Sequence, residues 1–259
     1  LEIDAIQKTV HQMCNLLQHG GPDDEGYFTS PEDKLVLGNR RHALIDLSPD
    51  GHMPMSYQNR YHITYNGELY NFLSLKEELV SLGYHFNSHT DTEVILASFA
   101  QWNIQAFAKL KGMYAFALWD QAEKNLYLVR DAAGIKPLYY ATGTGSLIFA
   151  SEVRAFAPVD ELQVSNENWP VYLMAYGHVP EPVSTLALVK PLHKGCFLKY
   201  ELKHDTHTIG SFSHYSYSHQ IVTESEAREN IQLSLDHSVQ SHLLADAPLG
   251  VYLSGGLDS

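Results

Sequence analysis

Residues 62–71 have the sequence HITYNGELYN, in which a short apolar run is followed by an asparagine and a glycine. The run His62–Tyr65 contains β-branched and aromatic residues, which favour a strand. Asn66 and Gly67 then place a side-chain amide and an accessible backbone N–H at the end of that strand. Two such donors can form an oxyanion hole. An Asn-Gly pair is also typical of a hairpin turn, so this stretch alone leaves both interpretations open.

Similar strand and helix patterns lie on both sides of this stretch. Short apolar runs predict further strands at Leu35–Leu37, Tyr114–Leu118, Leu126–Val129, Leu138–Ala141, Leu147–Ala150 and Cys196–Tyr200. Apolar residues at helical spacing predict helices over residues 3–17, 73–82, 93–102 and 168–176. Many strands with few helices fit an α+β fold.

The sequence changes character near its C-terminal end. Residues 203–219 are rich in His, Ser and Thr with little apolar periodicity, so we expect a linker or loop between two domains. A helix is expected to begin there with Thr223 or Ser225 as its N-cap. Its apolar face would be formed by Ile231, Leu235, Val239 and Leu243.

Composition limits the class of function. The 259 residues are 44% hydrophobic and carry a formal net charge of −13, which disfavours binding to nucleic acid. The two cysteines, Cys14 and Cys196, show neither a disulfide nor a metal-ligand pattern, which fits a reducing compartment. No apolar run approaches the length that spans a membrane. We therefore expect a cytoplasmic protein that contacts neither nucleic acid nor membranes.

The C-terminal end carries a glycine-rich motif. A short strand, Val251–Leu253, is expected to run into Ser254, Gly255, Gly256, Leu257, Asp258 and Ser259. Small residues let backbone N–H groups approach a phosphate, the serines can donate hydrogen bonds, and Asp258 could hold Mg²⁺. A tight turn without a ligand is the alternative. The string lacks the lysine of a Walker A loop and favours a nucleotide site that releases pyrophosphate.

Polar residues that could bind an amino acid are spread along the N-terminal part. Arg41 could clamp an α-carboxylate or lie on the surface. Asp91 could bind an α-ammonium group or belong to an acidic first helical turn after Thr90. Residues 21–26 are expected to form a turn rich in carboxylates. Together with Asn66-Gly67 these groups describe a pocket for an amino acid that undergoes acyl transfer.

A nucleophile is harder to find. Cys14 lies within an apolar helical pattern and is expected in the core. Cys196 lies in a strand and has no obvious base nearby. Neither cysteine is a convincing catalytic thiol.

The order of the motifs resembles that of the asparagine synthetase family, whose first half is a class II glutamine amidotransferase domain. The matching strings are HGGPDDEG (19–26), GNRRHALID (38–46), YNGELYN (65–71), HTDTEVIL (89–96), GMYAFALWD (112–120), RDAAGIKPLYY (130–140), FASEV (149–153), YGHVPEP (176–182) and PLGVYLSGGLDS (248–259). They occur in the family's order and span nearly the whole chain.

The resemblance implies a role for each site residue. Asn66 and Gly67 would form the catalytic oxyanion hole. The glutamine-binding residues would be Arg41, Leu44, Ile45, Asn66, Gly67, Glu68 and Asp91. The ATP-binding residues would be Leu253, Ser254, Gly255, Gly256, Asp258 and Ser259, with Asp258 as a ligand of Mg²⁺.

The resemblance also implies a fold and a reaction. Residues 1–214 would form a four-layer α/β/β/α amidotransferase sandwich of the N-terminal-nucleophile type. Residues 215–259 would begin an α/β nucleotide-binding domain with a parallel sheet. Glutamine would be hydrolysed to supply ammonia, ATP would activate aspartate as β-aspartyl-AMP, and asparagine would be formed. Family members often dimerise, so the resemblance is compatible with a homodimer.

The sequence departs from the family at several points. The family begins with a catalytic cysteine whose base is its own α-amino group. By this resemblance, about fifteen residues including that cysteine would precede Leu1. Gly20 and Ala132 stand where arginines are usual. We therefore expect this chain to be a fragment without glutaminase or synthetase activity. The alternatives are a β-lactam-synthetase-like or other ATP-dependent amide ligase without glutaminase activity, and a non-catalytic glutamine-binding module.

Overall fold

The computed structural model describes residues 2–143, 145–213 and 223–256. Its α-helices are α1 (Ile3–Leu16), α2 (Phe72–Ser81), α3 (Asp91–Trp102), α4 (Trp169–Tyr176) and α5 (Glu224–His242). Short 3₁₀ helices cover Gln18–Gly20, Pro49–Gly51, Asn103–Lys109, Val153–Phe156 and Asp160–Leu162. The predicted helices at 3–17, 73–82, 93–102 and 168–176 are confirmed within a few residues at each end.

A six-stranded antiparallel sheet lies at the centre, in the order β11-β10-β6-β5-β4-β3. Its strands are β3 (Met55–Tyr57), β4 (Tyr61–Leu69), β5 (Gly112–Asp120), β6 (Asn125–Arg130), β10 (Cys196–Glu201) and β11 (Thr206–Ser211). A second layer holds the hairpin of β1 (Asp24–Ser30) and β2 (Leu35–Arg41). It also holds the sheet β8-β7-β9, formed by β7 (Tyr139–Gly143), β8 (Ser146–Ala150) and β9 (Lys190–Pro191).

The side chains of β5 explain how the layers stack. Phe116 and Leu118 join the core against α2 and α3, whereas Ala117 and Trp119 join the core between the two sheet layers. Successive strand residues point to opposite faces, so a strand buried on both faces is continuously apolar. This is why residues 112–120 contain an uninterrupted apolar run.

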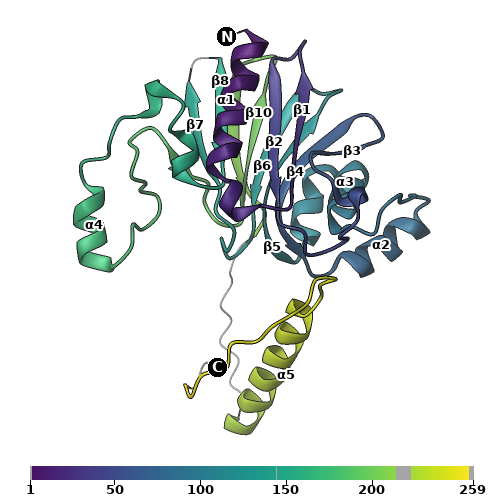
Figure 1. Ribbon diagram of the computed structural model, residues 1–259. Helices are drawn as coiled ribbons and strands as arrows, with labels where there is room; N and C mark the ends of the chain where they lie inside the picture. Colours follow the sequence, from purple (N-terminus) through teal and green to yellow (C-terminus); the bar gives the residue numbers. More distant parts are fainter. Residues whose placement is uncertain (1, 144, 214–222, 257–259) are drawn as a thin grey trace.

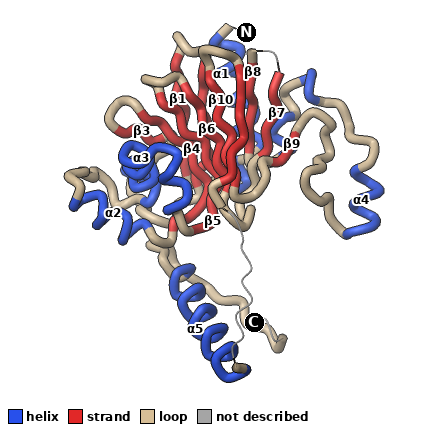
Figure 2. Tube along the Cα trace, turned by 180° about the vertical axis from the view of Figure 1, so that it is seen from behind, coloured by secondary structure: helices blue, strands red, loops and turns tan. Residues whose placement is uncertain are grey.

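Helices cover the outer faces of both sheet layers. Met13 of α1 packs with Ala141 and Ala150 of the second layer, and α2 and α3 cover the central sheet from the other side. Figures 1 and 2 show this arrangement from opposite directions. The expected four-layer α/β/β/α sandwich is confirmed.

Two predictions are wrong, one for the expected linker at residues 203–219 and one for the expected turn at residues 21–26. Residues 206–211 form β11, which pairs with β10, although we expected a linker or loop over 203–219. The prediction failed because β11 is an edge strand that is largely exposed and therefore polar. Residues 21–26 do not form a carboxylate-rich turn, because Asp24–Gly26 already belong to β1 and pair with β2.

Of the two elements predicted near the C-terminal end, the helix is present and the strand at residues 251–253 is not. Helix α5 begins with a capping box between Thr223 and Glu226, and it projects from the sandwich (Figure 1). Its expected apolar face, which includes Ile231 and Leu235, is exposed. Residues 251–253 are not a strand, because a strand needs a hydrogen-bonded neighbour and the described residues provide none there.

Because β5 is buried on both faces, we expect that shortening one of its side chains lowers the stability far more than shortening an exposed side chain of α5. Leu118 is completely buried, and Leu118→Ala should lower the free energy of unfolding by about 2–5 kcal/mol. The matched control is Leu233→Ala on α5, where the side chain is 59% exposed. That change should stay within about 0.5 kcal/mol. Urea unfolding followed by circular dichroism measures both, and similar losses in the two variants would contradict the layer assignment.

Candidate active site

Arg41 lies at the end of β2 and is almost completely buried. Its guanidinium group donates to the backbone carbonyl oxygens of Ile45, Asp46 and Ser48. Gly51 lies directly against it, since a Cβ at that position would clash with the guanidinium group. Arg41 therefore organises the loop of residues 44–48, and part of its donor capacity is already used there.

Asp46 connects this loop to the start of α3. Its carboxylate accepts hydrogen bonds from the backbone and hydroxyl groups of Ser48 and, at 3.2 Å, from the backbone N–H of His89. His89 directly precedes Thr90, whose hydroxyl group caps α3 by accepting from the N–H of Glu93. The loop that holds Arg41 and the helix that carries Asp91 are thus fixed to each other.

Asn66 and Gly67 lie inside β4, so the hairpin-turn interpretation is wrong for this pair. Tyr65 and Leu69 belong to the core against α2 and α3, which places Asn66 and Glu68 on the opposite face of the strand. That face is directed toward the second sheet layer. A Cβ on Gly67 would lie 2.2 Å from the carbonyl oxygen of Met113, so only glycine fits between the strands.

Asp91 is buried at the N-terminal end of α3. Its Oδ2 accepts hydrogen bonds from the hydroxyl group of Tyr65 at 2.8 Å and from the backbone N–H of Leu69 at 2.9 Å. Burial raises the pKa of the Asp91 carboxyl above its ordinary value, although these hydrogen bonds oppose the shift. Burial also raises the pKa of Glu68, and the positive charge of Lys136 opposes that shift.

A cavity of about 1110 Å³ brings the predicted glutamine-site residues together. It extends between β2 and β8, with α1 on one side and the central sheet on the other. Among the described strands these two are not paired with each other. The residues of the predicted site that line the cavity are Arg41, Leu44, Ile45, Asn66, Gly67, Glu68 and Asp91.

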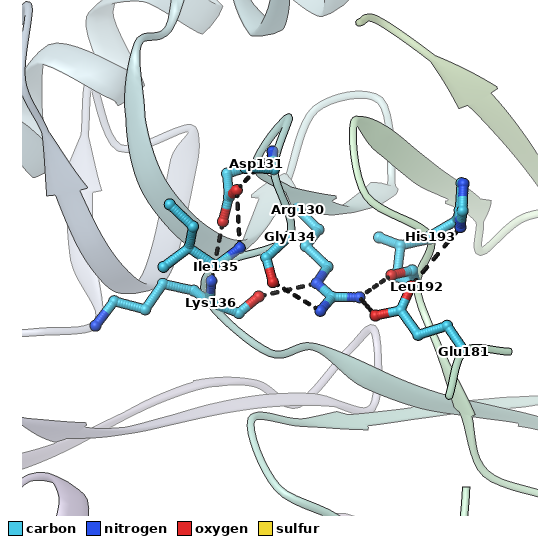
Figure 3. A network of polar contacts seen from close by, with 9 residues as sticks. Arg130, Asp131, Gly134, Ile135, Lys136, Glu181, Leu192 and His193 are labelled. Atoms are coloured by element: carbon cyan, nitrogen blue, oxygen red, sulfur yellow. Dashed lines mark hydrogen bonds and ion pairs between the residues drawn. The ribbon is translucent and has the colours of Figure 1, made fainter. Parts of the chain in front are cut away.

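Lys136 also lines this cavity, and the sequence analysis missed it. Figure 3 shows how its loop is held. The Asp131 carboxylate accepts from the backbone N–H groups of Ile135 and Lys136 at 3.0 Å each. Arg130 donates to the carbonyl oxygens of Lys136 and Gly134, and it pairs with Glu181. The RDAAGIKP string was the available signal, because its Arg-Asp pair folds the loop that presents Lys136.

Comparison with known proteins identifies the chain. The family described as glutamine amidotransferase domain matches residues 2–213. The chain belongs to this family. Residues 230–259 of the amidotransferase chain match the family described as asparagine synthase. The family resemblance expected from the motifs is confirmed.

Two of the curated relatives are named glutamine-hydrolyzing asparagine synthetases. The chain is 35% identical to the glutamine-hydrolyzing asparagine synthetase 1 of Bacillus subtilis (strain 168), with 98% of this chain and 40% of the relative covered. It is 32% identical to the glutamine-hydrolyzing asparagine synthetase B of Escherichia coli (strain K12), with 100% and 42% covered. The chain therefore spans about two fifths of the length of these relatives.

A solved structure supports the fold. The glutamine phosphoribosylpyrophosphate amidotransferase of B. subtilis, complexed with ADP and GMP, matches with a TM-score of 0.50 and 22% sequence identity. The match covers 69% of this chain and 35% of the solved chain. At this identity the likeness concerns the fold of the amidotransferase domain alone.

The predicted ATP-binding residues lie apart from the cavity. Leu253 is 82% exposed, and Ser254, Gly255 and Gly256 are exposed as well. The backbone N–H of Gly256 donates to the Ser254 hydroxyl group at 3.2 Å. Asp258, which is the predicted Mg²⁺ ligand, and Ser259 lie outside the described residues. Within residues 2–143, 145–213 and 223–256, no group of three or more His, Cys, Asp or Glu is arranged to hold a metal ion.

Both cysteines of the amidotransferase domain are buried, as predicted for Cys14. Burial raises the pKa of the Cys14 thiol, which keeps it protonated, and Gly38 packs against its Sγ. Cys196 begins β10 within the core between the sheets. Neither thiol has the properties of an activated nucleophile.

The raised pKa of Asp91 predicts a pH-dependent difference in stability. The folded chain holds this proton more tightly than the unfolded chain, so the resulting stability is present at low pH. It is lost as the pH rises above about 4, the ordinary aspartate value, through the raised value. Asp91→Asn cannot titrate there. Its free energy of unfolding relative to the wild type should therefore increase from about pH 4 upward.

Urea unfolding between pH 3 and pH 8 measures this difference, with Asp236→Asn on the exposed surface of α5 as the control. A difference between Asp91→Asn and wild type that is independent of pH would show that Asp91 titrates normally.

Proposed function

We propose that the cavity of this amidotransferase domain binds glutamine as the ammonia donor for asparagine synthesis. The observation that supports this most strongly is the convergence of Arg41, the 44–48 loop, Asn66-Gly67, Glu68 and Asp91 on one cavity. These groups come from β2, β4 and α3, and their chemistry matches the ends of an amino acid amide.

Each group has a distinct task in the proposed site. The Asp91 carboxylate would accept the α-ammonium group of glutamine, with Glu68 adding negative charge. Arg41 and the backbone of Leu44 and Ile45 would bind the α-carboxylate. Asn66 Nδ2 and the N–H of Gly67 would stabilise the negative oxygen that develops when the side-chain amide is attacked. The stacked sheets keep these donors fixed before the reaction begins.

Hydrolysis itself needs a nucleophile that neither buried cysteine supplies. We therefore expect this exact chain to bind glutamine without releasing glutamate. Glutamine hydrolysis of this type would need a thiol at a mature N-terminus, with its own α-amino group as the base. A non-catalytic glutamine-binding module is the second candidate, and the buried state of both cysteines favours it.

The synthetase half of the reaction is part of the same proposal. Leu253, Ser254, Gly255, Gly256, Asp258 and Ser259 would hold ATP and Mg²⁺, and the exposed Ser254–Gly256 backbone fits a phosphate-binding loop. When bound, ATP would supply the adenylyl group that activates aspartate. Homodimer formation and a cytoplasmic location stay predictions. No helix in the described part of the chain is long and apolar enough to cross a membrane.

Glutamine binding tests the proposal directly. Isothermal titration calorimetry should detect binding of glutamine to the wild-type chain, and Asp91→Asn should weaken it about tenfold or more, because a charge-assisted hydrogen bond is lost. Asp236→Asn removes the same charge from α5 and should leave the affinity unchanged. An assay for glutamate in the same samples should show no turnover. A wild-type chain that does not bind glutamine would refute the proposed site.

A further inference from the structure

The segment that follows α5 returns to the amidotransferase domain. Leu244 packs against the core between the central sheet and α2–α3. The ring of His242, the last residue of α5, lies against that of Tyr70 at a tilt of 44°, with ring centroids 4.3 Å apart. The segment lies within residues 230–259, which match the asparagine synthase family. The contacts made by His242 and Leu244 therefore join the region that matches asparagine synthase to the region that matches the amidotransferase domain.

Three hydrogen bonds join this segment to the 44–48 loop. The carboxylate Oδ2 of Asp246 accepts from the backbone N–H of Asp46 at 2.7 Å. The backbone N–H groups of Asp246 and Ala247 donate to the carbonyl oxygen of Leu44, at 2.9 and 3.2 Å. The contact is two-way and specific to Leu44 and Asp46, which are 200 or more residues away in sequence.

The loop is consequently held from two sides. Arg41 binds its carbonyl groups at Ile45, Asp46 and Ser48, and the 246–247 backbone binds its carbonyl group at Leu44. Asp46 has a positive φ of 52°, a conformation that a non-glycine residue rarely adopts without surrounding support. The bond from the Asp46 N–H to Asp246 and the bonds of the Asp46 side chain supply that support.

We propose that Asp246 is a positioning residue that links the segment after α5 to the proposed glutamine-binding cavity. It acts through the 44–48 loop, and the inference rests on the proposed function. With Asp246 in place, the loop presents Arg41 and the Leu44–Ile45 backbone to the cavity. When the segment after α5 shifts, the Asp46 N–H loses its acceptor, and the loop keeps only its contacts with Arg41 and with the His89 N–H. Glutamine affinity then falls.

Thermodynamic linkage makes this coupling reciprocal. A ligand that moves the segment after α5 changes the affinity for glutamine, and glutamine changes the affinity for that ligand by the same factor. These three hydrogen bonds form a bridge that joins a region matching asparagine synthase to the 44–48 loop, whose residues Leu44 and Ile45 line the cavity. Ligand binding that moves the segment after α5 thereby changes the affinity for glutamine through the 44–48 loop.

The variants Asp246→Ala and Asp246→Asn test the bridge, because the amide oxygen of asparagine still accepts a hydrogen bond and alanine does not. Asp246→Ala should weaken glutamine binding about two- to tenfold, the value of one hydrogen bond, and Asp246→Asn should restore it. Hydrogen exchange of the Asp46 amide, followed by NMR, should be faster in Asp246→Ala only. Asp236→Ala on α5 is the control, and circular dichroism checks that every variant is folded.

The two readouts separate the possible failures. A wild-type chain that does not bind glutamine refutes the proposed function, and the exchange rate of the Asp46 amide alone then decides whether Asp246 anchors the loop. Wild-type binding with unchanged affinity in Asp246→Ala overturns the inference and leaves the proposed function intact. Equal losses in Asp246→Ala and Asp246→Asn also overturn it, because the bridge would then not act through a hydrogen-bond acceptor.

Discussion

The contact between the Arg41 guanidinium group and the carbonyl oxygens of the 44–48 loop is the constraint on which the site depends. A loop that leaves the end of a strand has carbonyl groups that must be paired or hydrated. Arg41 pairs three of them with one rigid planar group, and it is itself removed from solvent. Because the loop in turn binds His89 through Asp46, the position of α3 depends on the same contact. A lysine could not replace this arginine, since its single ammonium group lacks the planar fork.

The stacked sheets provide the stiffness that this arrangement requires. Strand β4 is paired with β5 along its whole length and with β3 over Tyr61–Ile63, and its two faces belong to different environments. One face packs against α2 and α3, and the other carries Thr64, Asn66 and Glu68 toward the second layer. Asn39 of β2 donates to the hydroxyl group of Thr64 at 2.9 Å, which ties the two layers together beside the cavity. Polar groups on such a strand keep their geometry without a ligand, as an oxyanion hole needs.

Residues differ in how far the sequence could predict them. The apolar runs of β4, β5 and β6 were readable because burial on both faces requires continuous apolar residues. Strand β11 was not readable, since an exposed edge strand such as Thr206–Ser211 has the composition of a loop. The set of residues around the cavity followed from the order of the motifs. The contact between Arg41 and the carbonyl groups of the 44–48 loop could not be predicted, because the direction of a carbonyl group depends on the tertiary structure. Asp246 was missed for the same reason, because its partner Asp46 is 200 residues away in sequence. Lys136 was missed although Arg130 and Asp131, which hold its loop, are close to it in sequence.

The close approach of Gly67 to β5 has a consequence for how genetic variants at this position would be interpreted. Any side chain there would collide with the backbone at Met113 and Tyr114, and would separate the two central strands. Loss of function in such a variant would reflect damage to the framework as well as to the proposed oxyanion hole. A mutational screen would therefore classify Gly67 with the structural residues. Asn66, whose side chain is exposed on the same strand, is the neighbour at which chemistry can be separated from folding.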